Sequence, residues 1–314
     1  MLTPKVIVTV APTGGMAKKK QNPNLPTQPE EIAECVHRCY DEGASIVAVH
    51  ARRPDDEATC NPQIYGRTNA LIREKCDIII NNSTGGGIDG DMTIDLRQGL
   101  YETDFEERLK GAEAPLCEMV TFDCETVVAS FGGRNILVDT NPGRCDQMAE
   151  LFKKKGLKPE WEVFALSHLV QDCARLIKAG YDEPPYYVNL VLNGHGAFQG
   201  ALPYTPRVLQ TMVDHLPEKA IFNVSAIGSA QFPATTMSVL LGGHARVGLE
   251  DNLYYAKGRL ATNEELVARI VRIIRELGAE PATAAEARQM LGLKPVKTGA
   301  TASTEAGGAA RADH

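Results

Sequence analysis

Short apolar runs rich in β-branched residues alternate with helical segments along most of this chain. Eight of these runs are expected to be strands: Val6–Ala11, Ser45–His50, Asp77–Asn82, Met119–Asp123, Glu160–Ala165, Tyr187–Leu192, Ala220–Ser225 and Ala245–Gly248. Strands that alternate with helices form parallel sheets, and eight parallel strands can close into a barrel. The alternation therefore predicts an α/β fold, namely a single-domain (β/α)8 TIM barrel with its active site at the C-terminal ends of the strands.

A doubly wound open sheet is the alternative for the same order of strands and helices. That fold normally carries a G-x-G-x-x-G fingerprint directly after its first strand, where it holds a dinucleotide. Here the first strand is followed by Pro12–Met16, which reads P-T-G-G-M and does not match the fingerprint. The sequence therefore favours the closed barrel.

Apolar residues at helical spacing predict helices between the strands. They are expected at Ile64–Lys75, Cys145–Lys155, Leu169–Ala179, Pro233–Leu241 and Glu264–Leu277. Two further helix starts carry capping signals. Thr27 with Glu30 reads as a capping box, and Thr205 with Pro206 reads as an N-cap followed by a first-turn proline.

Length and composition limit the classes of function. A chain of 314 residues with 43% hydrophobic residues can build the core of one such barrel. The net charge of -7 and the lack of a basic stripe argue against nucleic-acid binding. No apolar run is long enough to span a bilayer, so no membrane partner is expected.

The cysteines and the two chain ends give further expectations. None of the eight cysteines forms a C-x-x-C pair, and Cys35 and Cys39 have the spacing of core residues on a helix. The chain begins in a strand without a signal peptide, which predicts reduced thiols and a cytoplasmic location. The barrel domain is expected to span residues 1–293, and residues 294–314, rich in Ala and Gly from Thr298 on, are expected to be flexible.

Polar residues accumulate where the predicted strands end, which is where barrel enzymes carry their chemistry. His50 ends the second strand and Glu250 follows the eighth, and imidazole with carboxylate suits zinc or a similar ion. The alternative is a buried histidine satisfied by a carboxylate. Asp251 lies next to Glu250, and Arg246 lies five residues earlier. This arginine could position Asp251 as a base, or the two could form a structural salt bridge.

Two glycine-rich segments lie at the same predicted end of the barrel. Ser83–Gly87 offers hydroxyls and accessible amides that suit a carboxylate, a phosphate or an oxyanion, although it could simply be a tight turn. Gly194–Gly200 could admit a large ligand or merely turn the chain. Arg52 or Arg53 could bind a substrate carboxylate, although one of them could instead make a structural ion pair.

Several motifs resemble the β-keto acid cleavage enzymes, the family of 3-keto-5-aminohexanoate cleavage enzyme. The resemblance runs from Val6 to about Leu293. It is carried by Gln21–Pro26, Gly43–Ser45, Asn82–Gly86, Gly242–His244 and Arg246–Asn252. The family has a zinc-containing (β/α)8 barrel, usually forms homotetramers, and converts a β-keto acid and acetyl-CoA into acetoacetate and a new acyl-CoA. The resemblance implies that this chain is an acyltransferase of that kind.

The resemblance also implies roles for single residues. Glu250 matches the metal carboxylate, and His50 matches the second histidine of a His-x-His metal pair. Asp251 matches the base and Arg246 its positioning partner. The serine of the S-T-G-G turn and a strand-4 threonine, which orient the substrate, match Ser83 and Thr121. A substrate-binding set is therefore expected at Thr84, Gly85, Gly86, Thr121 and Arg52, with acetyl-CoA entering over Gly194–Gly200.

This sequence departs from the family pattern at three positions. Ala48 stands where the first histidine of the pair is expected, Met16 replaces a glutamate after the first strand, and Ala165 lies near an expected strand-5 carboxylate. Zinc binding could therefore be weakened or lost, or a third ligand could come from His168, His195 or Asp123. A lyase or hydrolase on a small keto acid that needs no CoA, and a non-catalytic binding protein, are the alternative functions.

Overall fold

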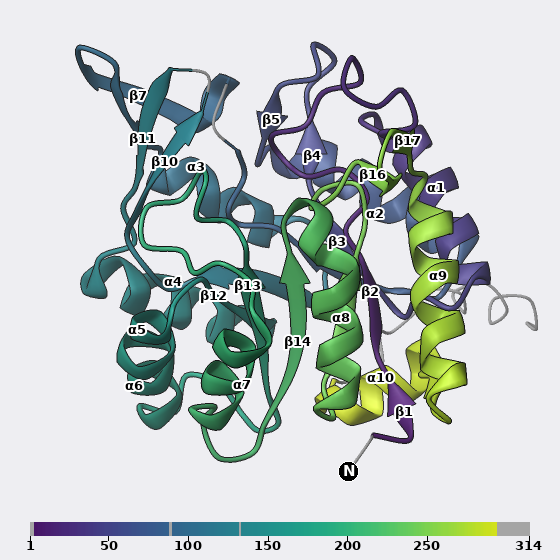
Figure 1. Ribbon diagram of the computed structural model, residues 1–314. Coiled ribbons are helices and arrows are strands. Elements are labelled where there is room, and N and C mark those ends of the chain that lie inside the picture. Colours follow the sequence, from purple (N-terminus) through teal and green to yellow (C-terminus); the bar gives the residue numbers. More distant parts are fainter. Residues whose placement is uncertain (1–2, 88–89, 132, 294–314) are drawn as a thin grey trace, which may run out of the picture.

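All eight predicted strands are present and form one closed parallel barrel. The computed structural model describes residues 3–87, 90–131 and 133–293. The barrel strands are β2 (Val8–Val10), β3 (Ile46–Val49), β6 (Ile79–Asn82), β9 (Met119–Asp123), β12 (Lys158–Val163), β13 (Tyr186–Leu192), β14 (Ala220–Ala226) and β15 (His244–Val247). Neighbours in the barrel are also neighbours in the sequence, and β15 pairs with β2 to close it. The closure confirms the barrel and excludes the open sheet (Figure 1).

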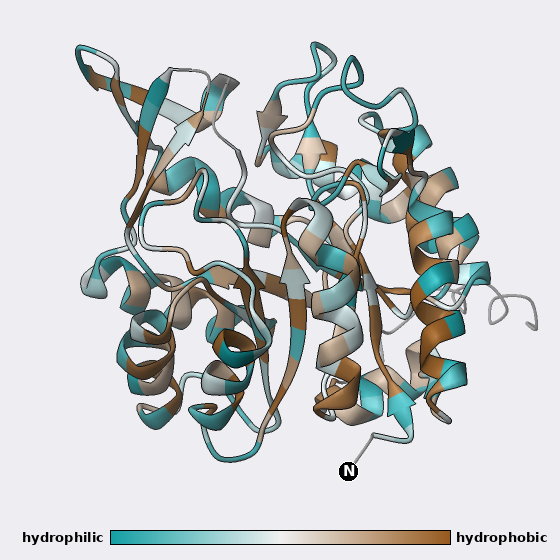
Figure 2. Cartoon of the chain, in the orientation of Figure 1, coloured by the Kyte–Doolittle hydropathy of each residue, from teal (hydrophilic) through white to brown (hydrophobic). Residues whose placement is uncertain are grey.

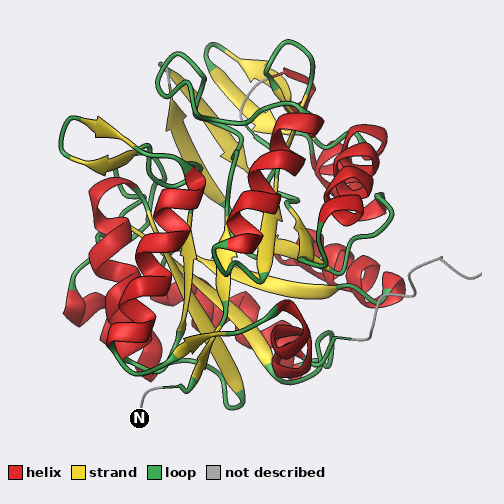
Figure 3. Cartoon of the chain, turned by 90° about the vertical axis from the view of Figure 1, so that its right-hand side faces the viewer, coloured by secondary structure: helices red, strands yellow, loops and turns green. Residues whose placement is uncertain are grey.

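Helices surround the barrel, as the alternation predicts (Figure 3). They are α1 (Pro29–Asp41), α2 (Pro62–Lys75), α4 (Pro142–Lys155), α5 (Leu166–His168), η3 (Leu169–Cys173), α6 (Ala174–Lys178), α7 (Pro206–Asp214), α8 (Gln231–Leu240) and α9 (Asn263–Glu276). On α9 the apolar side is buried, including Leu266, Ile270 and Ile274, and polar residues cover the outer side (Figure 2). Burial of this side, rather than helix propensity alone, fixes the helix against the strands.

The start of α1 lies one residue later than predicted. Gln28 is the N-cap, and Glu31 completes the capping box. Thr27 instead donates its hydroxyl to Asp56 at 2.6 Å. By contrast, the predicted N-cap Thr205 accepts the amide of Val208 at 3.1 Å, as expected.

The lower end of the barrel interior is apolar and closed by a helix. Strand side chains alternate between the inside and the outside of the barrel. At this end the inward residues Ile7, Ile46 and Met119 pack against Ala287 and Leu291 of α10 (Ala284–Leu291). In Figure 1 this helix lies beneath the strands, near the N-terminal end of the chain. Ligands therefore have access from the opposite end, where the strands point.

A four-stranded sheet outside the barrel was not predicted. It is formed in the order β10 (Val127–Phe131), β11 (Arg134–Val138), β8 (Leu100–Thr103) and β7 (Thr93–Arg97). It comes from the segments after β6 and β9 and stands above the barrel mouth at the upper left of Figure 1. Residues of the Gly194–Gly200 loop attach to it, because Phe198 bridges to Ala129 and Ser130 donates its amide to Ala197 at 2.8 Å.

The remaining elements are short. They are β1 (Lys5–Val6), β4 (Ala51–Arg52), β5 (Ala58–Thr59), η1 (Gly90–Met92), α3 (Phe105–Leu109), η2 (Lys110–Glu113), η4 (Gly228–Ala230), β16 (Tyr254–Ala256), β17 (Arg259–Leu260) and β18 (Glu280–Pro281). None of the helices described combines the length and hydropathy that a bilayer span requires. The expectation of a flexible segment at 294–314 lies outside the described residues, and the single-domain boundary at residue 293 stays a prediction.

Candidate active site at the barrel mouth

A cavity opens at the C-terminal ends of the barrel strands. It is lined by Gly15, Met16, His50, Ser83, Gly85, Gly86, Gly87, Asp123, Glu125, Val127, Val138, Glu162, Phe164, Val191, Phe198, Ile227, Arg246, Glu250 and Asp251. The polar residues come from the barrel strands and the turns that follow them. Val127 and Val138 come from the outer sheet, and Phe198 comes from the Gly194–Gly200 loop. The cavity therefore combines charged groups with an apolar wall.

Arg246 is the central cation of this cavity. Its guanidinium donates to Glu250 at 2.6 Å, to Glu162 at 2.7 Å and to Asp251 at 3.3 Å. Arg246 itself is only 4% exposed, so these contacts are shielded from water. Asn189 donates to the same oxygen of Glu162 at 2.9 Å, which fixes the outer end of the network. The predicted pair of Arg246 and Asp251 is therefore in contact, within a larger cluster.

The two adjacent carboxylates of this cluster have opposite pKa shifts. Burial raises the pKa of Asp251 to about 6, although Arg246 opposes the shift. Burial would also raise the pKa of Glu250, but His50 and Arg246 together lower it to about 2. Neighbouring groups whose environments push their pKa values apart are typical of acid–base sites. Here Glu250 stays ionised while Asp251 can exchange a proton near neutral pH.

His50 and Glu250 converge as a metal pair would. His50 Nδ1 lies 2.9 Å from the carbonyl oxygen of Gly86, which can only accept, so Nδ1 carries the proton. Nε2 faces Glu250 Oε1 at 3.4 Å. That arrangement requires a proton or a cation between the two atoms. The second oxygen of Glu250 is buried with no hydrogen-bond partner in the described part of the chain. The pair fits two ligand positions of a divalent ion.

Among the residues that the structure describes, no third ligand joins this pair. Ala48 offers no donor, His168 accepts the amide of Phe164, and His195 lines a separate surface hollow beside the outer sheet. Asp123 lines the cavity, but it forms no three-ligand group with His50 and Glu250. Catalytic zinc usually has three protein ligands, so the residues fit such a site only in part.

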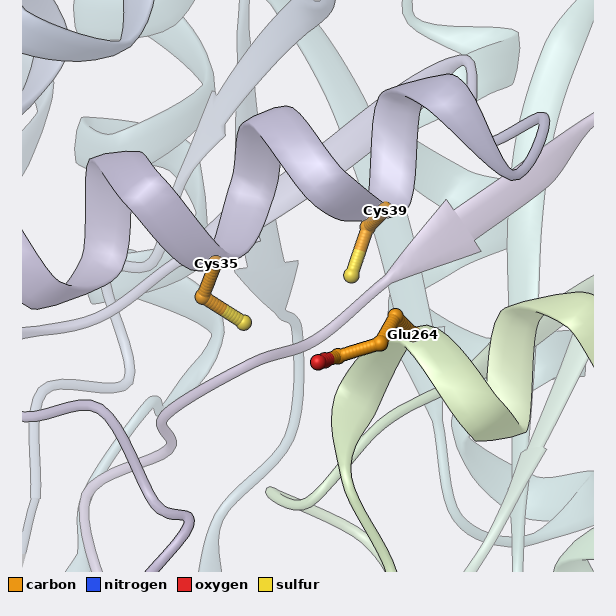
Figure 4. Close-up of side chains that lie close together, drawn as sticks. All are labelled: Cys35, Cys39 and Glu264. Carbon is orange, nitrogen blue, oxygen red and sulfur yellow. The ribbon is translucent and has the colours of Figure 1, made fainter.

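Another group of side chains that could hold an ion lies elsewhere. The sulfurs of Cys35 and Cys39 and a carboxylate oxygen of Glu264 lie within 4.8 Å of one another. Cys35 and Cys39 come from α1 and Glu264 comes from the first turn of α9 (Figure 4). Asn263 donates to the sulfur of Cys35 at 3.3 Å, and Arg38 pairs with Glu264 at 3.1 Å. Within residues 3–87, 90–131 and 133–293 this is the one group of three such ligands, and the sequence did not predict it.

The Ser83–Gly87 turn approaches the loop after β2 very closely. A Cβ atom on Gly15 would lie 2.4 Å from the carbonyl oxygen of Gly86 and 2.9 Å from Cα of Gly87. That contact requires glycine at position 15. The Ser83 hydroxyl accepts the amide of Gly85 at 3.1 Å and lines the cavity. The turn therefore lines the cavity with Ser83 and the glycine backbone, at the end of the barrel where the sequence predicts it.

Thr84 and Thr121 hold that turn against β9. The Thr84 hydroxyl donates to the carbonyl of Thr121 at 2.7 Å, and the Thr84 amide donates to the Thr121 hydroxyl at 3.1 Å. Neither residue is part of the cavity lining, so they support the turn from behind. Fully buried Arg108 donates to the Thr84 carbonyl at 2.9 Å and reaches Asp123 at 3.4 Å. The sequence did not single out Arg108.

Arg52 is placed away from the predicted ligand contact. It is 1% exposed, and its guanidinium donates to the carbonyls of Gly14, Ala17 and Asp56 at 2.7–3.0 Å. It does not line the cavity. Since its donors hold the loop after β2, this placement argues for a structural role. Arg53 pairs with Asp55 and Glu57 near the surface.

Two acidic residues of the cavity, Glu162 and Glu125, were overlooked as site residues, whereas Asp123 was predicted only as a possible third metal ligand. Glu162 and Asp123 are inward residues of their strands, and Glu125 follows β9 directly. A signal for Glu162 was present, because Glu160 and Glu162 alternate within a strand that is otherwise apolar at its centre. An acidic residue inside a barrel strand must face a polar interior.

Known proteins resemble this chain over nearly its whole length. The sequence profile of the beta-keto acid cleavage enzyme family matches residues 5–293. The chain is 38% identical over 291 residues to a 3-keto-5-aminohexanoate cleavage enzyme of Acetoanaerobium sticklandii, covering 92% of this chain and 98% of that protein. It is 30% identical over 298 residues to a 3-dehydrocarnitine:acetyl-CoA trimethylamine transferase of Rhizobium meliloti, covering 92% and 97%.

Solved structures resemble the barrel at lower identity. Apo ObcA superimposes with a TM-score of 0.68 at 20% identity, covering 86% of this chain and 66% of ObcA. This chain thus spans slightly less than two thirds of that longer one. The ternary complex of ObcA with a C4-CoA adduct and oxalate gives a TM-score of 0.65. At this identity the likeness supports the fold alone.

Proposed function

This chain belongs to the β-keto acid cleavage enzyme family, and we propose that it transfers the acyl part of a 3-keto acid to coenzyme A, with acetyl-CoA as co-substrate and acetoacetate as the second product. The family match and the transferase activities named for its relatives support this reaction class. The observation that carries it is the contact of Arg246 with Asp251 and Glu250 beside an open cavity.

Asp251 is the proposed base. A proton on the carbon between a keto group and a carboxylate is acidic enough for a positioned carboxylate to remove. The resulting carbanion forms a bond to the acetyl carbon and releases the CoA thiolate. The thiolate then adds to the keto carbon of the acid, and the original carbon–carbon bond breaks. Its electron pair stays with acetoacetate, which recovers the proton from Asp251, and the remaining acyl group leaves on CoA.

The other cavity residues stabilise charge and hold the substrate. Arg246 orients Asp251, and the Ser83 hydroxyl, which the Gly85 amide holds in place, offers a donor together with the amide of Gly86 to the substrate carboxylate or to an enolate oxygen. His50 and Glu250 would hold a divalent ion, which would polarise the keto group as a Lewis acid. Thr84 and Thr121 act indirectly, by supporting the turn.

The proposal also covers the bound ion, the oligomeric state, the cellular location and the path by which acetyl-CoA enters. We propose zinc as the ion, with fewer protein ligands than usual because of Ala48. We also propose a homotetramer, for which exposed Ile94 and Leu96 on the outer strand β7 offer an apolar contact surface. All eight cysteines are free thiols, which supports a cytoplasmic location. Acetyl-CoA would enter over the Gly194–Gly200 loop.

The direct test is a panel of 3-keto acids, each incubated with acetyl-CoA and assayed for acetoacetate and the new acyl-CoA. We expect both products in equal amounts from at least one acid. If acids are consumed without CoA and no acetoacetate forms, the lyase or hydrolase alternative replaces this proposal.

A further inference from the structure

Two thiols and a carboxylate converge between α1 and α9, outside the barrel. Cys35 and Cys39 are four residues apart, so they lie on the same face of α1. Glu264 belongs to the first turn of α9, and its carboxylate points toward the two sulfurs (Figure 4). The three ligand atoms lie within 4.8 Å of one another. None of these residues lines the barrel-mouth cavity, so the proposed reaction does not use them.

The spacing of these atoms is close to that of ligands around a single ion. Zinc binds thiolate sulfur at about 2.3 Å and carboxylate oxygen at about 2.0–2.2 Å, so its tetrahedral ligand atoms lie about 3.5–3.8 Å apart. The limit of 4.8 Å is wider than this by about 1 Å, a gap that small side-chain rotations can close. Positions i and i+4 of a helix are also the spacing at which helical histidine pairs hold zinc.

The surroundings of the group suit thiolate ligands. Cys35 is 2% exposed and Cys39 is 0% exposed. The side-chain amide of Asn263 donates to the sulfur of Cys35 at 3.3 Å, and such donors orient the ligands of metal sites. Arg38 donates to Glu264 at 3.1 Å. Two thiolates and a carboxylate carry three negative charges, of which a divalent ion would neutralise two and Arg38 the third.

We propose that Cys35, Cys39 and Glu264 form a metal site, separate from the barrel mouth, for a thiophilic divalent ion such as zinc. Magnesium and calcium prefer oxygen ligands, so two thiolates disfavour them. A ligand set that mixes sulfur with carboxylate suits borderline zinc better than soft Cu(I). The side chain of Glu264 is 29% exposed, so the ion can enter from solvent between the two helices.

Asn263 connects this site to the loops of the barrel mouth. Its side-chain amide also donates to the carbonyl of Pro12 at 3.1 Å, and its side-chain oxygen accepts the amide of Leu249 at 2.8 Å. Pro12 lies in the loop after β2, and Leu249 directly precedes Glu250. An ion bound to Cys35 would therefore fix α1 and α9 relative to these loops. Its role is structural, since no ligand of this site touches the cavity.

The first test titrates the metal-stripped full chain with Co²⁺, which substitutes for zinc. A thiolate ligand adds a sulfur-to-cobalt charge-transfer band in the near ultraviolet, which the histidine and carboxylate of the barrel mouth cannot produce. We expect this band in the wild type and its loss in Cys35→Ser/Cys39→Ser. Cys76→Ser/Cys117→Ser is the matched control, because it removes two thiols from other parts of the chain, and it should keep the band. No band in the wild type, or a band that persists in Cys35→Ser/Cys39→Ser, overturns the site.

A second variant tests the carboxylate and serves if the serine pair does not fold. Glu264→Gln keeps both thiols and the shape of the side chain. We expect it to weaken Co²⁺ binding by about 10-fold or more, since even groups beyond the direct ligands contribute that much. Glu276→Gln, exposed at the other end of α9, should bind Co²⁺ as the wild type does. Unchanged affinity in Glu264→Gln would overturn the three-ligand site.

Discussion

Arg246 carries one positive charge but contacts three carboxylates. Each contact depends on the others, because removing one carboxylate changes the charge that the remaining two share. Effects of substitutions inside this cluster should therefore be non-additive. Replacing Arg246 itself would leave buried carboxylates without their cation, which is strongly destabilising. The roles of single members are better separated by substitutions that keep the shape of the side chain.

Asp251→Asn keeps the shape of the base and removes its proton acceptor. We expect kcat to fall by about 10²-fold or more, with little change in the free energy of unfolding. Steady-state kinetics and urea unfolding measure the two quantities. Asp146→Asn is the matched control, because Asp146 also pairs with an arginine, Arg175 at 2.8 Å, but on the surface. Near-normal turnover in Asp251→Asn would assign the base to another residue.

Two places in the described part of the chain could hold an ion, and elemental analysis of variants distinguishes them. If the ion lies at the barrel mouth, His50→Ala and Glu250→Gln should lose it, because each removes one of two convergent ligands. The double variant Cys35→Ser/Cys39→Ser should then keep it. The reverse result would place the ion between α1 and α9. If the wild-type protein holds no divalent ion, two protein ligands are insufficient here. That result would agree with the presence of Ala48 where a third ligand, a histidine, is expected.

The sequence predicted those residues of the site that stand at strand ends. His50, Ser83 and Glu250 follow apolar runs, so their shared end of the barrel followed from the topology. Glu125 and Arg108 gave no such signal. Their importance depends on burial and on which partners lie within reach, and both properties come from segments distant in sequence.

At the scale of elements, two glycine-rich loops meet at the barrel mouth. Gly15→Ala places a methyl group against the Gly86 carbonyl, which also accepts the hydrogen bond from His50. We expect the turn to shift and kcat/KM to fall by about 10-fold or more, since small displacements of catalytic groups are costly. Gly143→Ala, exposed at the start of α4 with only ordinary contacts, should have no such effect. Unchanged kinetics for Gly15→Ala would mean that the loops can separate freely.

The strands of the barrel were easier to predict from the sequence than the strands of the sheet outside the barrel. All eight barrel strands are buried and carry apolar runs, which is the pattern that sequence reasoning detects. Strand β7 is exposed at four of its five positions, so it has no alternation of buried and exposed residues. Its pairing depends on β8 and on the distant hairpin of β10 and β11. The helix start at α1 was misplaced by one residue, because Gln28 and Thr27 both offer capping groups.

At the scale of the whole molecule, barrel closure depends on a buried neutral histidine. His244 lies in β15, the last strand of the barrel, and its Nδ1 accepts the amide of Ile7 beside β2 at 3.2 Å. The ring is 2% exposed. Burial lowers the pKa of His244 from 6.5 to about 4. Protonation would remove the acceptor for Ile7 and place an unpaired charge inside the barrel.

Acid should therefore destabilise the fold through His244. Between pH 6.5 and 4 the unfolded chain binds a proton at this histidine that the folded chain does not, so the free energy of unfolding falls as the pH falls. A difference of this size corresponds to about 3 kcal/mol at pH 4. Urea unfolding over this pH range measures it. His244→Asn keeps an acceptor without a titrating ring and should flatten the pH dependence, whereas the same substitution at exposed His215 should not. Equal slopes for all three proteins would contradict the assignment of this sensitivity to the barrel closure.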